Sequence, residues 1–221
     1  MTRFFFFLLF LLIGISITYY YVVQEKKVLK VVNPVDLNPE MVDDSQRLKR
    51  KGYDHKIGDF SFKNQNGDVI TQSYIEGKIH IAEYFFTTCG SICPIMNQNM
   101  KRLQEEFFHE KDIKMLSFTV NPEIDTIEQM KRYSIRYNAN DNQWHFLTGR
   151  KDSLYSLARK SYFVLKPAES RNMGDAGSDF IHTNNFVLVD RDKRIRGYYD
   201  GTSKSGIDSL IIDINFLLKE K

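Results

Sequence analysis

The chain has few of the residues that build small disulfide-rich or zinc-rich proteins. Only two of its 221 residues are cysteine, and proline occurs five times. Two cysteines cannot form a disulfide scaffold or a four-thiolate zinc site. A hydrophobic content of 42% with 14% aromatic residues excludes a disordered chain. The net charge of +3 comes from scattered lysines and arginines, so we expect no nucleic-acid partner.

An uncharged apolar run, FFFFLLFLLIGISITYYYVV, occupies residues 4–23. A helix of about 20 such residues is just long enough to cross the hydrocarbon core of a membrane. The run is long for a signal peptide and has no clear cleavage site, so we favour an uncleaved N-terminal transmembrane helix over a removed signal peptide for residues 1–23. No cysteine follows the run, which argues against a lipid anchor.

The charges that flank this run disagree about its orientation. Arg3 favours an N-terminus in the cytoplasm, whereas Lys26, Lys27 and Lys30 at the other end favour the reverse. Long C-terminal domains are often translocated despite such charges. We therefore predict a single-pass protein of the cytoplasmic membrane, with its domain on the extracytoplasmic (periplasmic) side.

The remainder of the chain divides into a tether and one domain. Residues 24–52 have no sustained apolar period and contain two prolines, which is typical of a tether. Residues 53–221 begin with a hairpin pattern and then alternate buried-strand patterns with amphipathic helices, ending in a second hairpin and a helix. This order predicts an α/β domain with a mixed sheet and helices on both faces.

Both cysteines lie between the first buried strand, KIHIAEYFFTT, and the helix that follows it. The N–H groups at a helix start favour a thiolate, and ligands gather at the C-terminal ends of parallel strands. The four-residue spacing of Cys89 and Cys93 suits either a disulfide or two ligands of one metal. A redox pair and a metal site both remain open, and a pair of inert buried residues is disfavoured. We expect Gly90 to give the loop a conformation restricted to glycine.

A metal site needs at least one further ligand, and the chain has five histidines. Four of them fit ordinary core or surface positions: His55, His80, His109 and His145. His182 instead follows a long polar stretch and precedes a buried strand, and loops of such length are usually functional. Two thiolates and one imidazole make a poor closed zinc site but suit copper. We do not assign Met173, in the same loop, as a ligand.

Several segments, in order, resemble the SCO/SenC family of membrane-anchored, thioredoxin-like copper proteins. YFFTTCGSICP resembles the family's strand that leads into Cys-x3-Cys-Pro, and SFTVNPEIDT resembles its next strand and helix start. WHFLTG and FIHTNNFVLVDRDKRIRGYYDG are similar to the segments that follow. The resemblance covers about residues 56–217. It departs at Gly90, where many members have proline, and at Asn121, where aspartate is usual; we assign Asn121 no role.

The resemblance implies a thioredoxin fold in which Cys89, Cys93 and His182 bind one copper ion, Cu(I) or Cu(II). It implies a chaperone that delivers copper to, or maintains the thiols of, the binuclear copper site of cytochrome c oxidase. The partner would be subunit II of that oxidase or another copper-accepting protein.

The alternative function is that of an enzyme, a thiol-disulfide oxidoreductase of the extracytoplasmic space that uses Cys89 and Cys93 as its disulfide pair. The sequence leaves this choice open. His182 separates the two functions, because disulfide exchange does not need it. A thiol peroxidase ranks below both, because Thr87 or Thr88 has no matching arginine.

Overall fold

The computed structural model of the chain describes residues 2–23, 28–42, 55–164 and 183–220. Its α-helices are α1 (Thr2–Val23), α3 (Ile92–Glu106), α4 (Ile127–Arg136), α5 (Lys151–Lys160) and α6 (Lys204–Lys219). Its strands are β1 (Ser61–Lys63), β2 (Val69–Thr71), β3 (Ile79–Phe85), β4 (Ile113–Thr119), β5 (Trp144–Leu147), β6 (Asn185–Val189) and β7 (Ile195–Asp200). Three short 3-10 helices are η1 (Pro34–Asp36), η2 (Pro39–Met41) and η3 (Gln72–Tyr74).

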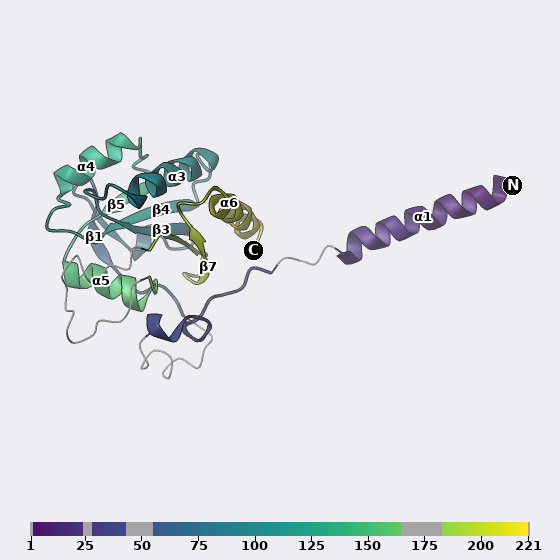
Figure 1. The fold of residues 1–221 in the computed structure, drawn as a ribbon, viewed down its shortest axis with the longest axis horizontal. Coiled ribbons are helices and arrows are strands. Elements are labelled where there is room, and N and C mark those ends of the chain that lie inside the picture. Colours follow the sequence, from purple (N-terminus) through teal and green to yellow (C-terminus); the bar gives the residue numbers. More distant parts are fainter. Residues whose placement is uncertain (1, 24–27, 43–54, 165–182, 221) are drawn as a thin grey trace.

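Five strands form one mixed sheet in the order β5-β4-β3-β6-β7 (Figure 1). β3, β4 and β5 are parallel, whereas β6 pairs antiparallel with β3, and β7 antiparallel with β6. The predicted first hairpin is β1 and β2, which form a separate two-stranded sheet. Its turn includes Gly67, whose φ of 85° is easily adopted by glycine. The α/β class and the mixed sheet are therefore confirmed.

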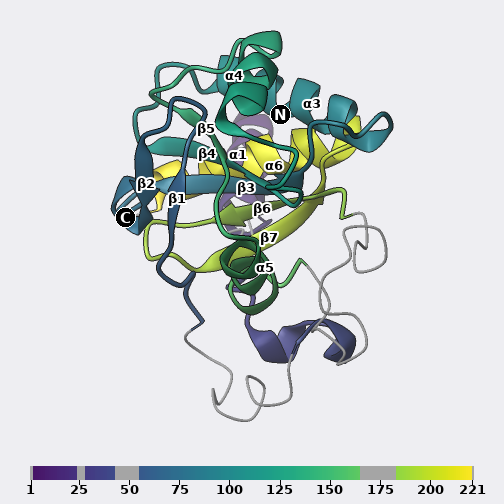
Figure 2. The same ribbon diagram turned by 90° about the vertical axis from the view of Figure 1, so that its left-hand side faces the viewer.

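Helices cover both faces of the sheet. α3, α4 and α6 lie on one face, here called the α3 face, and α5 lies on the other, the α5 face (Figures 1 and 2). β3 lies in the middle of the sheet and is buried along its whole length. Its residues alternate, so that Ile81 and Phe85 pack on the α3 face while Ala82 and Tyr84 pack on the α5 face. This double coverage explains why β3 is a continuous apolar run in the sequence.

Helix α3 packs on the sheet through one apolar stripe. Met96, Met100 and Leu103 recur every three or four residues, and each is fully buried. Pro94 is the third residue of the helix, where its ring breaks no helical hydrogen bond. The stripe fixes the rotation of α3 and thereby the direction in which its first turn faces.

Residues 28–42, within the predicted tether, pack against the domain. The Val32 N–H donates to the carbonyl of Ile195 in β7 at 2.8 Å, and Val42 is only 2% exposed. The guanidinium of Arg196 donates to the Leu29 carbonyl at 2.6 Å, across 167 residues of sequence. The sequence analysis missed these contacts because the apolar residues of this segment follow no period and their partners are remote. Both ends of the predicted tether lie outside the described residues.

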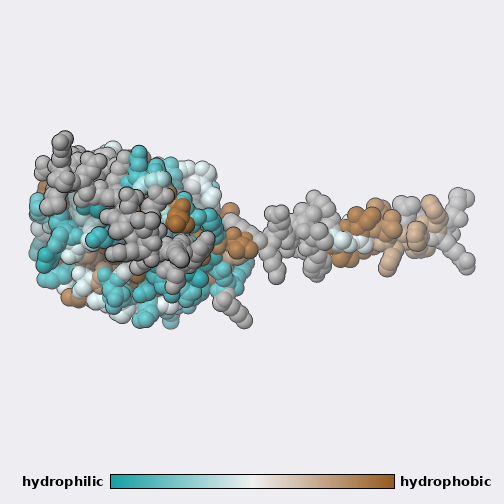
Figure 3. All heavy atoms as spheres, turned by 90° about the horizontal axis from the view of Figure 1, so that it is seen from below, coloured by the Kyte–Doolittle hydropathy of each residue, from teal (hydrophilic) through white to brown (hydrophobic). Residues whose placement is uncertain are grey.

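The N-terminal apolar run forms α1. Many of its large apolar side chains are exposed, including Phe4 at 70% and Phe10 at 80% (Figure 3). Among the helices formed by the described residues, none has both the length and the apolar character required to span a membrane.

Candidate functional site

The two cysteines lie where the chain passes from β3 into α3. The chain leaves β3 through a turn in which the Cys89 N–H donates to the Phe86 carbonyl at 3.2 Å. Cys93 is the second residue of α3. Ser91, the residue that precedes the helix, makes no side-chain cap. The N–H groups at this helix start are therefore available to other acceptors.

The sulfur of Cys89 takes the place of a cap. Its Sγ accepts a hydrogen bond from the Cys93 N–H at 3.5 Å and lies 3.7 Å from Oγ of Ser91. The pair is present as two thiols, with Cys89 at 8% and Cys93 at 3% exposure. Cys89 thus lies in the turn just before α3 and Cys93 in the first turn of α3, close enough for a hydrogen bond between them.

The two thiols differ in acidity. Burial alone would raise the pKa of Cys89, but hydrogen bonds from the side chain and backbone of Cys93 and from Ser91 outweigh burial and lower this pKa. Burial raises the pKa of Cys93, and the hydrogen bond to Cys89 raises it further. Cys89 is therefore the residue that ionises first, and Cys93 is its protonated partner.

A buried carboxyl group lies close enough to the pair to affect it. Glu83 of β3 is 0% exposed, and its Oε1 accepts a hydrogen bond from Oγ of Ser117 at 2.5 Å. Ser117 accepts one in turn from Nε1 of Trp144 at 2.8 Å. Burial raises the pKa of Glu83 to about 8, although the Ser117 hydrogen bond opposes this rise. A negative charge on Glu83 raises the pKa of Cys93, so the two groups resist being ionised together.

A second buried carboxylate, Asp125, holds the loop that leads to Cys89. Asp125 is 0% exposed and lies between β4 and α4. It accepts hydrogen bonds from the N–H of Thr87, at 3.2 Å to Oδ1, and from the Thr87 hydroxyl. It also accepts one from the hydroxyl of Thr119, the last residue of β4. The Thr87 hydroxyl is thus committed to a carboxylate, which counts against its use in a peroxide pocket.

The expectation for Gly90 is wrong. Its φ lies outside the left-handed region, and a Cβ built on it meets nothing within 4 Å. The chain reverses through the ordinary turn between Phe86 and Cys89, so no glycine-restricted conformation is needed. This position can therefore carry a side chain without strain.

Four histidines occupy the core or surface positions predicted for them. His55, His80 and His145 are buried, and each ring has a hydrogen-bonding partner within the domain. His109 is exposed after α3. Within the described ranges, no group of three or more His, Cys, Asp or Glu residues is arranged to hold a metal ion. His182 and Met173 lie outside the described residues.

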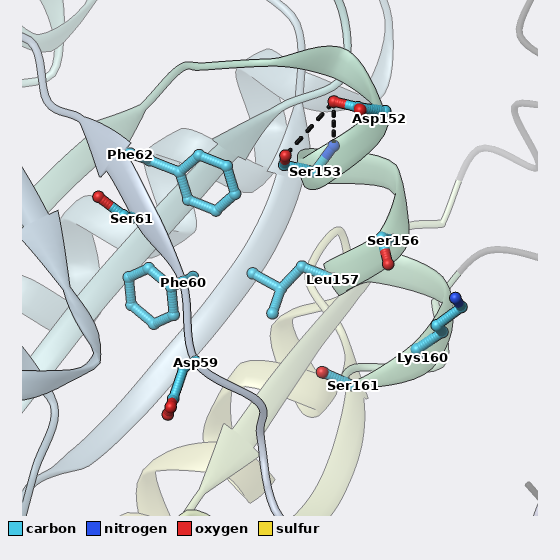
Figure 4. Close-up of a pocket in the computed structure, with 10 residues that line it drawn as sticks. All are labelled: Asp59, Phe60, Ser61, Phe62, Asp152, Ser153, Ser156, Leu157, Lys160 and Ser161. Carbon is cyan, nitrogen blue, oxygen red and sulfur yellow. Dashed lines mark hydrogen bonds between the residues drawn. The ribbon is translucent and has the colours of Figure 1, made fainter.

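A hollow of about 620 Å³ lies on the other side of the sheet, between β1 and α5 (Figure 4). Phe60, Phe62 and Leu157 line it and belong to the core of the α5 face. Cys89 and Cys93 belong to the core of the α3 face. The hollow is therefore not part of the dithiol site.

Comparison with known proteins identifies the family. The family model described as SCO1/SenC matches residues 49–217, which is most of the chain. The chain belongs to the SCO1/SenC family. The SCO1 protein homologue of Bacillus subtilis (strain 168) is 32% identical over 162 residues, covering 72% of this chain and 81% of that protein. A protein of Stutzerimonas stutzeri, provisionally named as copper-binding, is 29% identical over 61% of this chain and 64% of its own length.

A solved structure agrees with this assignment. BsSco, described as a member of the Sco family of cytochrome c oxidase assembly proteins with a disulfide switch, has a TM-score of 0.64 to this chain. It is 29% identical, and the match covers 76% of this chain and 95% of BsSco. The predicted thioredoxin-like fold is thereby confirmed for this SCO1/SenC protein.

Glu83 and Asp125 are two residues of the site that the sequence does not single out. The signal for Glu83 was a single carboxylate inside an apolar strand, which alternation places on a buried face. For Asp125 the only signal was its position before a helix, where an aspartate usually serves as a cap. The cap of α4 is instead Thr126, whose side chain accepts from the Gln129 N–H.

The buried carboxyl of Glu83 should make stability depend on pH. Its pKa is about 8 in the fold and near the model-peptide value of 4.5 when unfolded, so the folded state favours the protonated form. Stability from this group is therefore complete below pH 4.5 and is lost as pH rises to about 8, by at most about 1.4 kcal/mol per pH unit. Glu83→Gln keeps the acceptor for Ser117 but cannot ionise. We expect the variant to gain stability relative to the parent as pH rises from 5 to 8.

Denaturant unfolding at several pH values measures this difference. The exposed residue Glu76 provides the control, since Glu76→Gln makes the same substitution at a carboxyl group that the fold does not bury. Parallel profiles for the Glu83→Gln variant and the parent would show that Glu83 is ionised in the folded protein.

Proposed function

We propose that this SCO1/SenC protein binds one copper ion through Cys89, Cys93 and His182. We further propose that it delivers copper to, or maintains the thiols of, the binuclear site of cytochrome c oxidase. The observation that carries the proposal is the placement of the two cysteines side by side at the start of α3, with the Cys89 Sγ accepting the N–H of Cys93 at 3.5 Å. Thiolates are soft ligands that suit cuprous copper, and imidazole suits both oxidation states.

The sheet register supports His182 as the third ligand. β6 pairs antiparallel with β3 with Ala82 opposite Val187, so β6 begins beside the C-terminal end of β3. The cysteine loop leaves from that same end. Thr183, which follows His182 in the sequence, precedes β6 by two residues and therefore lies near this edge of the sheet. A third ligand from this segment completes a set that the described residues alone do not supply.

The loop also suits the transfer of a metal to another protein. Thr88, Gly90 and Ser91 are exposed beside the two largely buried sulfurs. An acceptor can therefore approach over the loop and replace one ligand at a time. The relatives described as copper-binding and as cytochrome c oxidase assembly proteins favour copper as the cargo and that oxidase as its destination. The proposed acceptor is subunit II of the oxidase or another copper-accepting protein.

Copper titration of the reduced full chain tests the ligand set. The parent should bind one equivalent of copper and, as Cu(II), show a strong sulfur-to-copper absorption band. His182→Ala should weaken binding by at least about tenfold, since it removes one of three ligands. His109→Ala, at an exposed histidine, is the matched control and should bind as the parent does. Equal affinity of the His182→Ala variant and the parent would refute the three-ligand site.

A thiol-disulfide oxidoreductase is the second candidate, and the unequal acidity of the two thiols favours it. The Cys89 thiolate would attack a partner disulfide and release one partner thiolate, forming a mixed disulfide. Cys93 would then lose its proton and attack Cys89, leaving the partner as a dithiol and this protein as a disulfide. The disulfide switch described for BsSco is consistent with such a cycle.

Single cysteine variants distinguish attacking from resolving sulfur. Cys93→Ser keeps the attacking Cys89 and removes the resolving thiol, so it should accumulate a mixed disulfide with a small disulfide probe. Cys89→Ser leaves only the buried Cys93 and should react much more slowly. Non-reducing mass spectrometry measures both adducts, and the opposite order of reactivity would reverse the assignment.

We also propose that residues 1–23 attach the domain to the cytoplasmic membrane, with the domain on the extracytoplasmic side. The support is the exposed apolar surface of α1, which includes Phe4 and Phe10. The full chain should remain with membranes after an alkaline wash, and Leu12→Arg should release it, because a charge there opposes insertion. Protease added outside spheroplasts should digest the domain. A wash-resistant Leu12→Arg variant, or a protected domain, would contradict this arrangement.

A further inference from the structure

The hydrogen-bond donors to Asp125 are unusual for an aspartate that precedes a helix. It comes two residues before the start of α4, yet the cap of that helix is Thr126. The carboxylate of Asp125 instead accepts from both polar groups of Thr87 and from the Thr119 hydroxyl. It is fully buried, and a buried carboxylate persists only where hydrogen bonds replace its hydration.

These hydrogen bonds fix the backbone just before Cys89. Thr87 precedes Cys89 by two residues, and its N–H and hydroxyl both donate to Asp125. Nε2 of Gln129 in α4 donates to the same hydroxyl at 3.2 Å. On the other side, the Phe86 carbonyl accepts the N–H of Cys89 at 3.2 Å. The turn that carries Cys89 is therefore held by hydrogen bonds to Asp125 and to Gln129 of α4.

The position of the Cys89 sulfur depends on this turn. The Cys89 Sγ accepts the Cys93 N–H at 3.5 Å, so this hydrogen bond links the Thr87 turn to the start of α3. Cys93 is fixed independently, because the apolar stripe of α3 holds its helix on the sheet. A movement of the Thr87 turn would therefore change the distance between the two sulfurs while leaving the helix in place.

We propose that Asp125 is a positioning residue for the dithiol: through Thr87 it holds Cys89 in the arrangement required by two separate thiols and, resting on the proposed function, by a copper ion. It does not touch the sulfurs. Without it, the turn relaxes and the two thiols pass their two electrons and two protons more readily to a small-molecule disulfide, such as oxidised dithiothreitol, and close into a disulfide. The hydrogen bonds between Asp125 and Thr87 thereby favour the reduced, metal-binding form over the oxidised form.

Three variants of the full chain separate positioning from mere packing. Asp125→Asn keeps the shape of the side chain but lacks the charge that holds Thr87. Thr87→Val keeps the N–H bond to Asp125 and removes the hydroxyl. Thr119→Val is the control, because it removes a hydroxyl that donates to the same carboxylate and accepts the Asn121 N–H, while both hydrogen bonds from Thr87 to Asp125 remain. All three lose hydrogen bonds to one buried group, but only the first two loosen the loop.

The thiol-disulfide equilibrium against dithiothreitol is the decisive readout, with no metal present. We expect Asp125→Asn and Thr87→Val each to shift it about tenfold toward the disulfide, the size of a lost charge-assisted hydrogen bond. The equilibrium constant of Thr119→Val should stay within about twofold of the parent's. This should hold even where Thr119→Val lowers the melting temperature as much as Thr87→Val does. If Asp125→Asn does not fold, Thr87→Val against Thr119→Val decides alone.

An equilibrium unchanged in Thr87→Val, or shifted equally in Thr119→Val, overturns the proposal and leaves Asp125 as a structural residue. Copper titration of the same variants follows, with weaker binding expected for the first two. Because the disulfide equilibrium needs no copper, a parent that fails to bind copper would refute the proposed function while leaving this test intact.

Discussion

The pairing of β3 with β4 on one side and β6 on the other is the constraint on which the site depends. The C-terminal end of β3 carries the cysteine loop. The same edge receives the end of β4, from which the chain runs to Asp125, and the start of β6, which follows Thr183. Three segments far apart in sequence therefore meet at one place because of strand order alone. The double coverage of the sheet makes this arrangement rigid, since β3 is buried along its length.

Two buried carboxyl groups flank the dithiol, and their surroundings give them opposite roles. Asp125 is surrounded by donors from Thr87 and Thr119, so its charge is compensated and can hold a loop. Glu83 has one donor, Ser117, and burial favours its neutral form. The neutral form avoids placing a second negative charge near a thiolate. The number of donors around each carboxyl group thus distinguishes the role of Asp125 from that of Glu83.

The periodicity of apolar residues in the sequence is sufficient to predict the sheet, the helices and the position of the cysteine pair between a strand and a helix. It failed where a contact depends on partners that lie far away in sequence. The packing of residues 28–42 is one case, because Val42 becomes a core residue only once the sheet exists. The role of Asp125 is another, since a position before a helix indicates a cap and only the fold brings Thr87 within reach. Gly90 is a different case. A glycine at this position indicates a special backbone conformation, but the turn does not require one.

The same asymmetry serves copper binding and disulfide exchange, so the two proposed chemistries compete for one pair of sulfurs. Cys89 ionises readily because α3 and Ser91 donate to it, whereas burial keeps Cys93 protonated. Disulfide exchange uses this difference directly, since one sulfur attacks while the other waits. For metal binding, Cys93 would instead have to lose its proton, and the positive charge of a bound metal would offset the cost of a second buried thiolate. In such a site Cys89 gives up its proton more readily than Cys93, and a bound cation would lower the cost of the second ionisation.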